Sequence, residues 1–121
     1  MKSPGPEHPI SVEPNARRVR VTFNGHVVAE SARVLLMREG NYRPVFYIPR
    51  EDADAALLKR ADHSTYCPYK GDASYFSIHA GGRISENASW TYEQPYSAVA
   101  EIKNYLAFYP SRVDAIEEIE G

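Results

Sequence analysis

The chain has 121 residues, 43% hydrophobic and 25% charged, with a formal net charge of −2. This length and composition predict one ordinary globular domain with a modest hydrophobic core. They exclude a membrane-spanning helix, which needs about 18 continuous apolar residues, and a strongly basic nucleic-acid-binding domain. With no apolar leader at the N-terminus and only one cysteine, we expect a cytoplasmic protein that contacts no membrane.

The N-terminal segment, residues 1–15, contains four prolines and one glycine and has no apolar periodicity. Such a composition predicts an extended arm, held to the rest of the protein at most near Ile10 and Val12. We therefore expect residues 16–121 to form a single β-rich domain.

The next segment has the period-2 pattern of a half-buried strand, because Val19, Val21 and Phe23 alternate with polar residues. Asn24-Gly25 follows, and both residue types tolerate the positive φ of a type I′ hairpin turn. We predict a returning strand over 26–31. Two further strands are predicted over 34–37 and 44–48.

Two segments suggest short helices. Pro49 and the acidic residues after it favour a helix of about two turns over 52–60. Near-helical spacing of apolar residues predicts a second helix over 97–108, which Pro110 ends. Residues 63–82 and 87–93 have strand patterns. The predicted fold class is mainly β, a small antiparallel two-sheet domain with two short helices.

We expect the segment HSTYCPYKGDASYFSIHAGG, residues 63–82, to form the functional face, because it combines the only cysteine, a Lys-Gly step and several rings. Cys67 is a candidate nucleophile, but a free cysteine is more often a buried structural thiol. On one strand, His63 would share its face yet lie about 13 Å away, too far for a hydrogen bond.

Lys70 and Gly71 form a second candidate site. A lysine beside a flexible glycine can bind a phosphate or carboxylate, although Lys-Gly-Asp is more often a polar turn between strands. The rings form a third. In the predicted strand over 73–80, Tyr75 points away from the apolar face formed by Phe76 and Ile78, and it could line a pocket with other aromatic residues.

Metal and partner binding receive less support. His26, His63, Cys67 and His79 could supply ligands, but they lack any diagnostic spacing, so we expect neither a metal nor a cofactor. Arg17, Arg18 and Arg20, in the first strand of the predicted hairpin, have no aromatic module signature beside them, so we expect no nucleic-acid partner. Residues 1–50 carry eight basic and four acidic residues, whereas residues 51–121 carry six and twelve. This asymmetry, with an edge hairpin, is compatible with a protein-interaction module or a homodimer.

Several motifs together resemble one bacterial and fungal family, the domain of unknown function DUF427, sometimes labelled nucleotidyltransferase-like. The similarity runs from about residue 5 to residue 118, and its most specific block is T-x-C-P-x-K-G-x-A-S-Y. The motifs that carry it are PEHPI, the run from FNGHVVAES to YIPREDAD, TYCPYKGDASYFSI, NASWTYEQPY and IKNYLAFYPSRVD.

The resemblance implies a β-tent type fold, a pair of sheets also found in methionine sulfoxide reductase B and in the cereblon ligand-binding domain. Such folds tend to bind ligands in an aromatic groove between the sheets. Many hold a structural zinc between Cys-x-x-Cys pairs, which this chain lacks. The motif positions that match are Thr65, Cys67, Lys70, Tyr75, Trp90 and Tyr92.

These observations lead us to expect a small-molecule-binding domain with a pocket around TYCPYKGDASY and a ligand that could be anionic or nucleotide-like. One alternative is an enzyme that uses Cys67 or has a nucleotidyltransferase-type activity, with Cys67 and Lys70 as the candidate catalytic residues. The other alternative is a protein-interaction module. Nucleotidyl transfer would require paired carboxylates and a phosphate cradle. Only Asp72 lies near the lysine in sequence, and a helix over 52–60 would place Asp52 and Asp54 on different faces.

Overall fold

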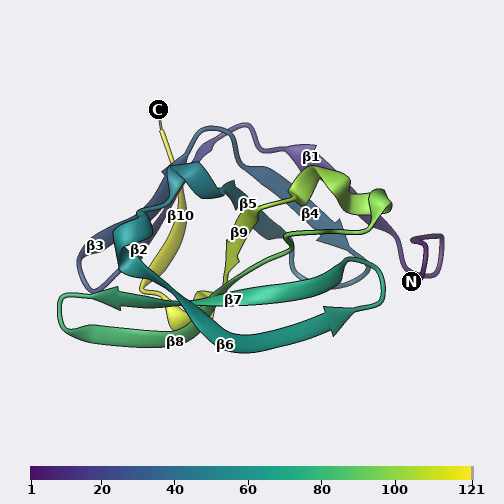
Figure 1. Ribbon diagram of the computed structural model, residues 1–121. Coiled ribbons are helices and arrows are strands. Elements are labelled where there is room, and N and C mark those ends of the chain that lie inside the picture. The colour runs from purple at the N-terminus through teal and green to yellow at the C-terminus, as the bar shows by residue number, and fades with distance from the viewer. Residues whose placement is uncertain (121) are drawn as a thin grey trace.

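The computed structural model describes residues 1–120, which form ten strands and four short 3₁₀ helices. Figure 1 shows them in chain order. The strands are β1 (Ile10–Pro14), β2 (Arg18–Phe23), β3 (His26–Ser31), β4 (Leu35–Glu39), β5 (Val45–Pro49), β6 (Leu58–Cys67), β7 (Gly71–Ala80), β8 (Arg83–Thr91), β9 (Tyr105–Phe108) and β10 (Ala115–Ile119). The 3₁₀ helices are η1 (Arg50–Asp52), η2 (Ala55–Leu57), η3 (Ser97–Ile102) and η4 (Pro110–Arg112).

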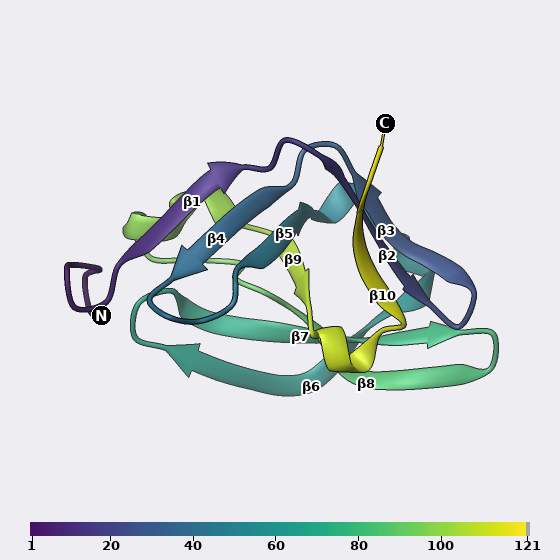
Figure 2. The ribbon, with the colours of Figure 1, turned by 180° about the vertical axis from the view of Figure 1, so that it is seen from behind.

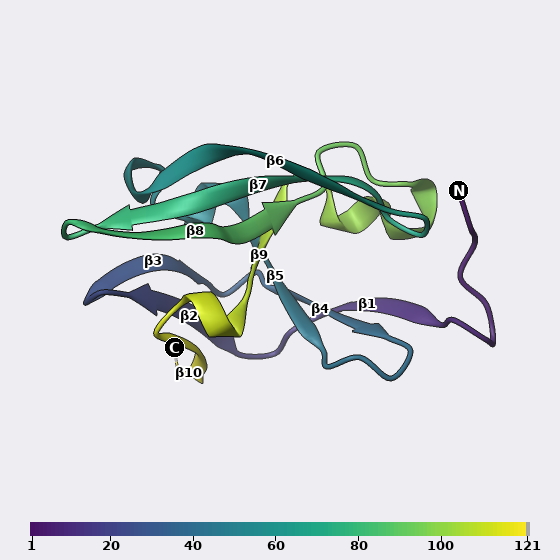
Figure 3. The same cartoon turned by 90° about the horizontal axis from the view of Figure 1, so that it is seen from below.

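The strands form two antiparallel sheets. The larger has the order β1-β4-β5-β9-β8-β7-β6 and the smaller the order β10-β2-β3. Seen from below, β6, β7 and β8 lie in one layer, while β2–β3 and β1–β4 lie in the other (Figure 3). Strand β9 passes between these layers, and the view from behind shows β5 beside it (Figure 2). The mainly β, antiparallel two-sheet prediction is confirmed.

The first hairpin forms as predicted. Asn24 and Gly25 have φ values of 49° and 76°, the left-handed conformation that a type I′ turn requires. Val19, Val21 and Phe23 are all buried, so the alternation in β2 does separate a core face from a solvent face.

The core consists of two clusters on opposite faces of β7. Phe76 and Ile78 belong to the cluster that includes β2 and β3, whereas Tyr75 and Ala73 belong to the other. The second cluster also includes Tyr47 from β5. Since successive side chains of a strand point to opposite sides, this arrangement places Tyr75 away from the first core.

The predicted helix over 52–60 is absent. Only η1 and η2 are helical, and residues 58–60 already pair with β7. The N–H of Asp54 donates to the carbonyl of Val28, and Ala53 bridges to Ala29. The Asp54 N–H thus bonds to strand β3 instead of continuing the helical turn of η1, so tertiary pairing overrides the local helix signals.

The predicted helix over 97–108 is also wrong. The 3₁₀ segment η3 is interrupted at Val99, whose φ is −128°, and Asn104 has a φ of 61° that reverses the chain. Residues 105–108 then form β9, which pairs with β5 on one side and β8 on the other. Apolar residues that resembled a helical stripe therefore fill a central strand that is buried on both faces.

The N-terminal arm joins the larger sheet. Strand β1 pairs with β4, so that Ile10 lies opposite Glu39, and both Ile10 and Val12 pack on the second cluster. Upstream, the ring of His8 stacks on Tyr69 at a centroid distance of 3.8 Å. Over residues 1–120, we find no helix with the length and apolar character needed to cross a membrane.

Candidate functional site

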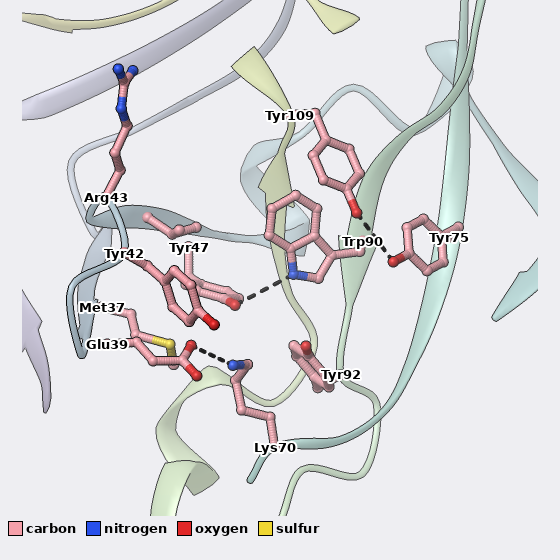
Figure 4. A pocket seen from close by; sticks show the side chains of 11 residues that line it. Met37, Glu39, Tyr42, Arg43, Tyr47, Lys70, Tyr75, Trp90, Tyr92 and Tyr109 are labelled. Atoms are coloured by element: carbon pink, nitrogen blue, oxygen red, sulfur yellow. Dashed lines mark hydrogen bonds and ion pairs between the residues drawn. The ribbon is translucent and has the colours of Figure 1, made fainter. Parts of the chain in front are cut away.

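A pocket of about 200 Å³ lies between the β4–β5 hairpin and strands β7 and β8, beside the second core cluster. Figure 4 shows Lys70 and Glu39 at one end, Tyr75 and Tyr109 at the other, and Trp90 between them. Side chains from both layers therefore surround one space. The lining residues are Met37, Glu39, Tyr42, Arg43, Val45, Tyr47, Lys70, Tyr75, Trp90, Tyr92 and Tyr109.

The turn between β6 and β7 fixes the position of Lys70. Its N–H donates to the carbonyl of Cys67 at 3.3 Å, and its own carbonyl accepts from Tyr96 N–H at 3.0 Å. Gly71 follows with a φ of 110°, and a Cβ there would lie 3.3 Å from the carbonyl oxygen of Gln94. A glycine therefore suits this position both for its backbone conformation and for the close approach of the neighbouring chain.

Lys70 is buried and bonded to a carboxylate. Its Nζ donates to Glu39 Oε1 at 2.5 Å, and the other oxygen of Glu39 lies 2.7 Å from Nε2 of His8. Burial opposes ionisation of Glu39, but the hydrogen bonds from Lys70 and His8 outweigh it, so the pKa of this carboxyl is lowered. The ammonium that the sequence offered for an anion is thus already paired with a carboxylate.

Aromatic rings form most of the pocket wall. Trp90 packs against Tyr109 with ring centroids 4.5 Å apart, and its edge meets Tyr47, to whose hydroxyl the indole N–H donates at 3.4 Å. Burial raises the pKa of both Tyr47 and Tyr92 well above the usual value for tyrosine. These phenols are therefore neutral over the physiological pH range and can donate hydrogen bonds.

A short chain of hydroxyls ends at the pocket. Thr65 Oγ1 lies 3.0 Å from the hydroxyl of Tyr75, which lies 3.2 Å from the hydroxyl of Tyr109. Burial, followed by the hydrogen bond from Tyr75, raises the pKa of Tyr109 to about 12. Thr65 is exposed and does not line the pocket, but it positions the ring of Tyr75, which does.

Cys67 does not lie in the pocket wall. It is half-buried, packs on the edge of the second cluster, and makes no sulfur hydrogen bond with any residue of 1–120. The two bases near it in sequence contact other groups: His63 packs edge-on against Tyr75, and Lys70 bonds to Glu39. The structure therefore places no general base or cation on this thiol.

The carboxylates considered for nucleotidyl transfer lie elsewhere. Asp52 accepts from Ser31 and Arg33, and Asp54 caps η2 through the N–H of Ala56. The pocket itself contains one carboxylate, Glu39. Across residues 1–120, His, Cys, Asp and Glu side chains do not gather in threes as a metal site would require.

Of the six residues proposed from the sequence, the pocket brings together Lys70, Tyr75, Trp90 and Tyr92, and it leaves out Thr65 and Cys67. The sequence reasoning missed the side that the β4–β5 hairpin contributes. One signal was available, because Glu39 is an acidic residue beside an apolar run and just before the Gly40-Asn41 turn. The pocket residues missed are Met37, Glu39, Tyr42, Arg43, Val45, Tyr47 and Tyr109.

A family model described as "Domain of unknown function (DUF427)" matches residues 11–119, which is nearly the whole chain. A search of curated proteins gave no match. The matched range includes every residue that lines the pocket and both sheets except Ile10, the first residue of β1.

Proposed function

The chain belongs to the DUF427 family of domains of unknown function, and we propose that it is a small-molecule-binding domain whose ligand occupies the pocket beside Trp90. The observation that carries this proposal is an unused hydroxyl. Tyr92 is only 6% exposed, lines the pocket, and its hydroxyl makes no hydrogen bond with any residue of 1–120. Among residues 1–120, Thr91 Oγ1 is the fully buried side-chain polar atom that lacks a partner, so the Tyr92 hydroxyl is not enclosed by protein. It is open to the pocket that Tyr92 lines, and it can donate to or accept from a ligand there.

The wall supports a planar ligand. Six of the lining residues are tyrosine or tryptophan, and such side chains combine a large apolar surface with a polar tip. Known small-molecule sites have the same character, mostly apolar and aromatic with a few convergent polar groups. A ring bound here would pack on Trp90 and accept a hydrogen bond from Tyr92.

The charges support neutral hydrogen-bonding groups on that ring. Lys70 and Glu39 compensate each other at one end of the pocket, where their side chains are 9% and 15% exposed. A phosphate placed on Lys70 would have to displace Glu39, leaving a carboxylate half-buried without its main cation. An uncharged heterocycle needs no such rearrangement.

A thermal-shift screen with nucleobases, other aromatic heterocycles, sugar phosphates and small acids tests the proposal. Ligand at about 100 times its Kd stabilises the folded state by roughly 2.7 kcal/mol, a shift of many degrees in Tm for a domain of this size. We expect heterocycles to bind, and we expect Tyr92→Phe to weaken them. Tyr66→Phe is the matched control, because Tyr66 is exposed and lies outside the pocket, with its hydroxyl bonded to Tyr96. A blank panel, or equal binding by the two variants, contradicts the proposal.

A further inference from the structure

A second, larger cavity adjoins the first pocket. Its volume is about 650 Å³, and it lies between strands β5, β8 and β9 of the larger sheet and strands β2 and β10 of the smaller one. The two cavities share four lining residues, so they border one another along a common wall. These residues are Arg43, Val45, Trp90 and Tyr109.

The first pocket is small for a complete ligand. Its volume of about 200 Å³ falls below the roughly 300–1,000 Å³ of typical small-molecule sites, whereas the second cavity lies within that range. A molecule that places one ring in the first pocket therefore has most of its available space in the second. The chemistry of the second cavity then determines the class of ligand.

The second cavity is apolar. Its floor includes Val21, Ile48 and Phe108, all of which are 4% exposed or less and belong to the first core cluster. Only Arg43 and Asp114 are charged among its lining residues. Apolar parts of a ligand are stabilised here because they leave water for a hydrocarbon surface.

The two charged residues differ in their availability. Asp114 Oδ2 already accepts from the backbone N–H of Asn24 at 2.7 Å. Arg43 makes no hydrogen bond or ion pair with the rest of residues 1–120, and Figure 4 shows its guanidinium pointing away from Glu39 and Lys70. One unpaired guanidinium at the shared wall suits one carboxylate, which it can bind through two parallel hydrogen bonds.

We propose that the ligand is an amphipathic monocarboxylic acid, with its apolar chain in the second cavity and its carboxylate at Arg43. This inference rests on the proposed function, because it assigns the rest of the same ligand. It also distinguishes the site from one for a nucleoside triphosphate, since several phosphate charges would meet only one unpaired cation and an apolar floor.

Titration with a series of straight-chain acids, hexanoate, octanoate and decanoate, tests the inference, with decanol as the uncharged analogue. Trp90 is the only tryptophan in the chain and lines both cavities, so its fluorescence reports occupancy. We expect affinity to rise about fourfold for each buried methylene group. Decanoate should bind at least about fivefold more tightly than decanol, a difference that Arg43→Gln removes. Arg38→Gln is the control, because Arg38 is exposed and pairs with Glu13 outside the cavities.

Filling the second cavity gives an independent check. Ala115 lines it from β10, so Ala115→Phe should abolish the dependence on chain length, whereas Ala115→Ser should keep it. Acids that do not bind, or that bind equally to Ala115→Phe, overturn the inference. If heterocycles still bind and respond to Tyr92→Phe in that case, the proposed function stands without it; if neither class binds, both fail. A third outcome is reversible dimerisation that Ala115→Phe abolishes but that decanoate leaves unchanged. This result would assign the cavity to a second copy of the chain and would also overturn the inference.

Discussion

The Nζ atom of Lys70 lies 2.5 Å from Oε1 of Glu39, and this ion pair closes one end of the pocket. The two residues are 31 positions apart in the sequence, one in the β6–β7 turn and the other at the end of β4. Their pairing connects the layer formed by β6, β7 and β8 to the layer that contains β1 and β4. It also determines which charges remain for a ligand.

Breaking the pair should destabilise the protein. Lys70→Met leaves the half-buried carboxylate of Glu39 without its main cation. We expect a loss of about 2–3 kcal/mol in the free energy of unfolding, somewhat less than for a fully buried pair. The double variant Lys70→Met with Glu39→Met should recover most of that loss, because no uncompensated charge remains. Urea unfolding at pH 7 measures both. A double variant less stable than Lys70→Met would show that the pair does not act as a unit.

Acid should remove the contribution of the ionised Glu39 side chain to the free energy of unfolding. Its pKa is lowered in the folded state, so the unfolded chain binds more protons than the folded one as the pH falls. The stabilisation is therefore complete above the pKa of Glu39 in the unfolded chain, about 4.5, and it is lost as the pH falls through the lower pKa of Glu39 in the folded protein. Glu39→Gln should flatten the decline in stability between about pH 5 and pH 3. Glu7→Gln, at an exposed position of the arm, should leave the slope as in the wild type.

The hydroxyl chain gives a smaller, more local effect. Tyr75→Phe removes the hydrogen bonds to Thr65 and Tyr109 without changing the ring, and we expect a cost of about 1 kcal/mol in thermal or urea unfolding. It should also lower the pKa of Tyr109 from about 12, which difference spectroscopy against Tyr109→Phe measures. An unchanged Tyr109 titration would contradict the hydrogen bond between the two phenols.

Cys67 should be dispensable for ligand binding. The thiol lies outside the pocket wall and contacts no base, so Cys67→Ser should leave the Kd of any heterocycle unchanged while weakening packing at the edge of the second cluster. Calorimetric titration of the variant checks this. A tenfold loss of affinity in Cys67→Ser would show that the thiol does contribute to ligand binding.

His8 should act through the arm. His8→Phe keeps the stacking on Tyr69 and loses the bond to Glu39, whereas His8→Ala loses both. We therefore expect two successive decreases in stability, each of about 1 kcal/mol or less. Amide hydrogen exchange across β1 should rise in the same order. Equal exchange in all three proteins would mean that the ring does not hold the arm.

The parts of the fold that the sequence predicted are those with local signals. The alternation in β2 and the Asn24-Gly25 turn depend on neighbouring residues only, and both appear as predicted. Strand β9 was mistaken for part of a helix because its place is set by β5 and β8, which are distant in sequence. Short segments of mixed apolar pattern are decided by such long-range pairing.

The candidate site likewise contains some residues with a local sequence signal and others whose role depends on contacts between distant parts of the chain. Trp90 and Tyr92 could be predicted as site residues from the sequence, because aromatic rings near a distinctive motif suggest the wall of a ligand pocket. The pairing of Lys70 with Glu39 could not, since it depends on how the β4–β5 hairpin approaches the β6–β7 turn. That pairing changes the expected ligand from an anion on Lys70 to a ring with neutral polar groups.

Titration of Trp90 fluorescence with the heterocycle panel, in the wild type, Tyr92→Phe and Tyr66→Phe, tests the central claim most directly. We expect saturable binding at one site. Tyr92→Phe should weaken this binding by about fivefold or more, because it removes one hydrogen bond to the ligand, whereas Tyr66→Phe should leave the binding unchanged. Binding that is absent, or that is the same in all three proteins, would contradict the claim that this pocket holds the ligand.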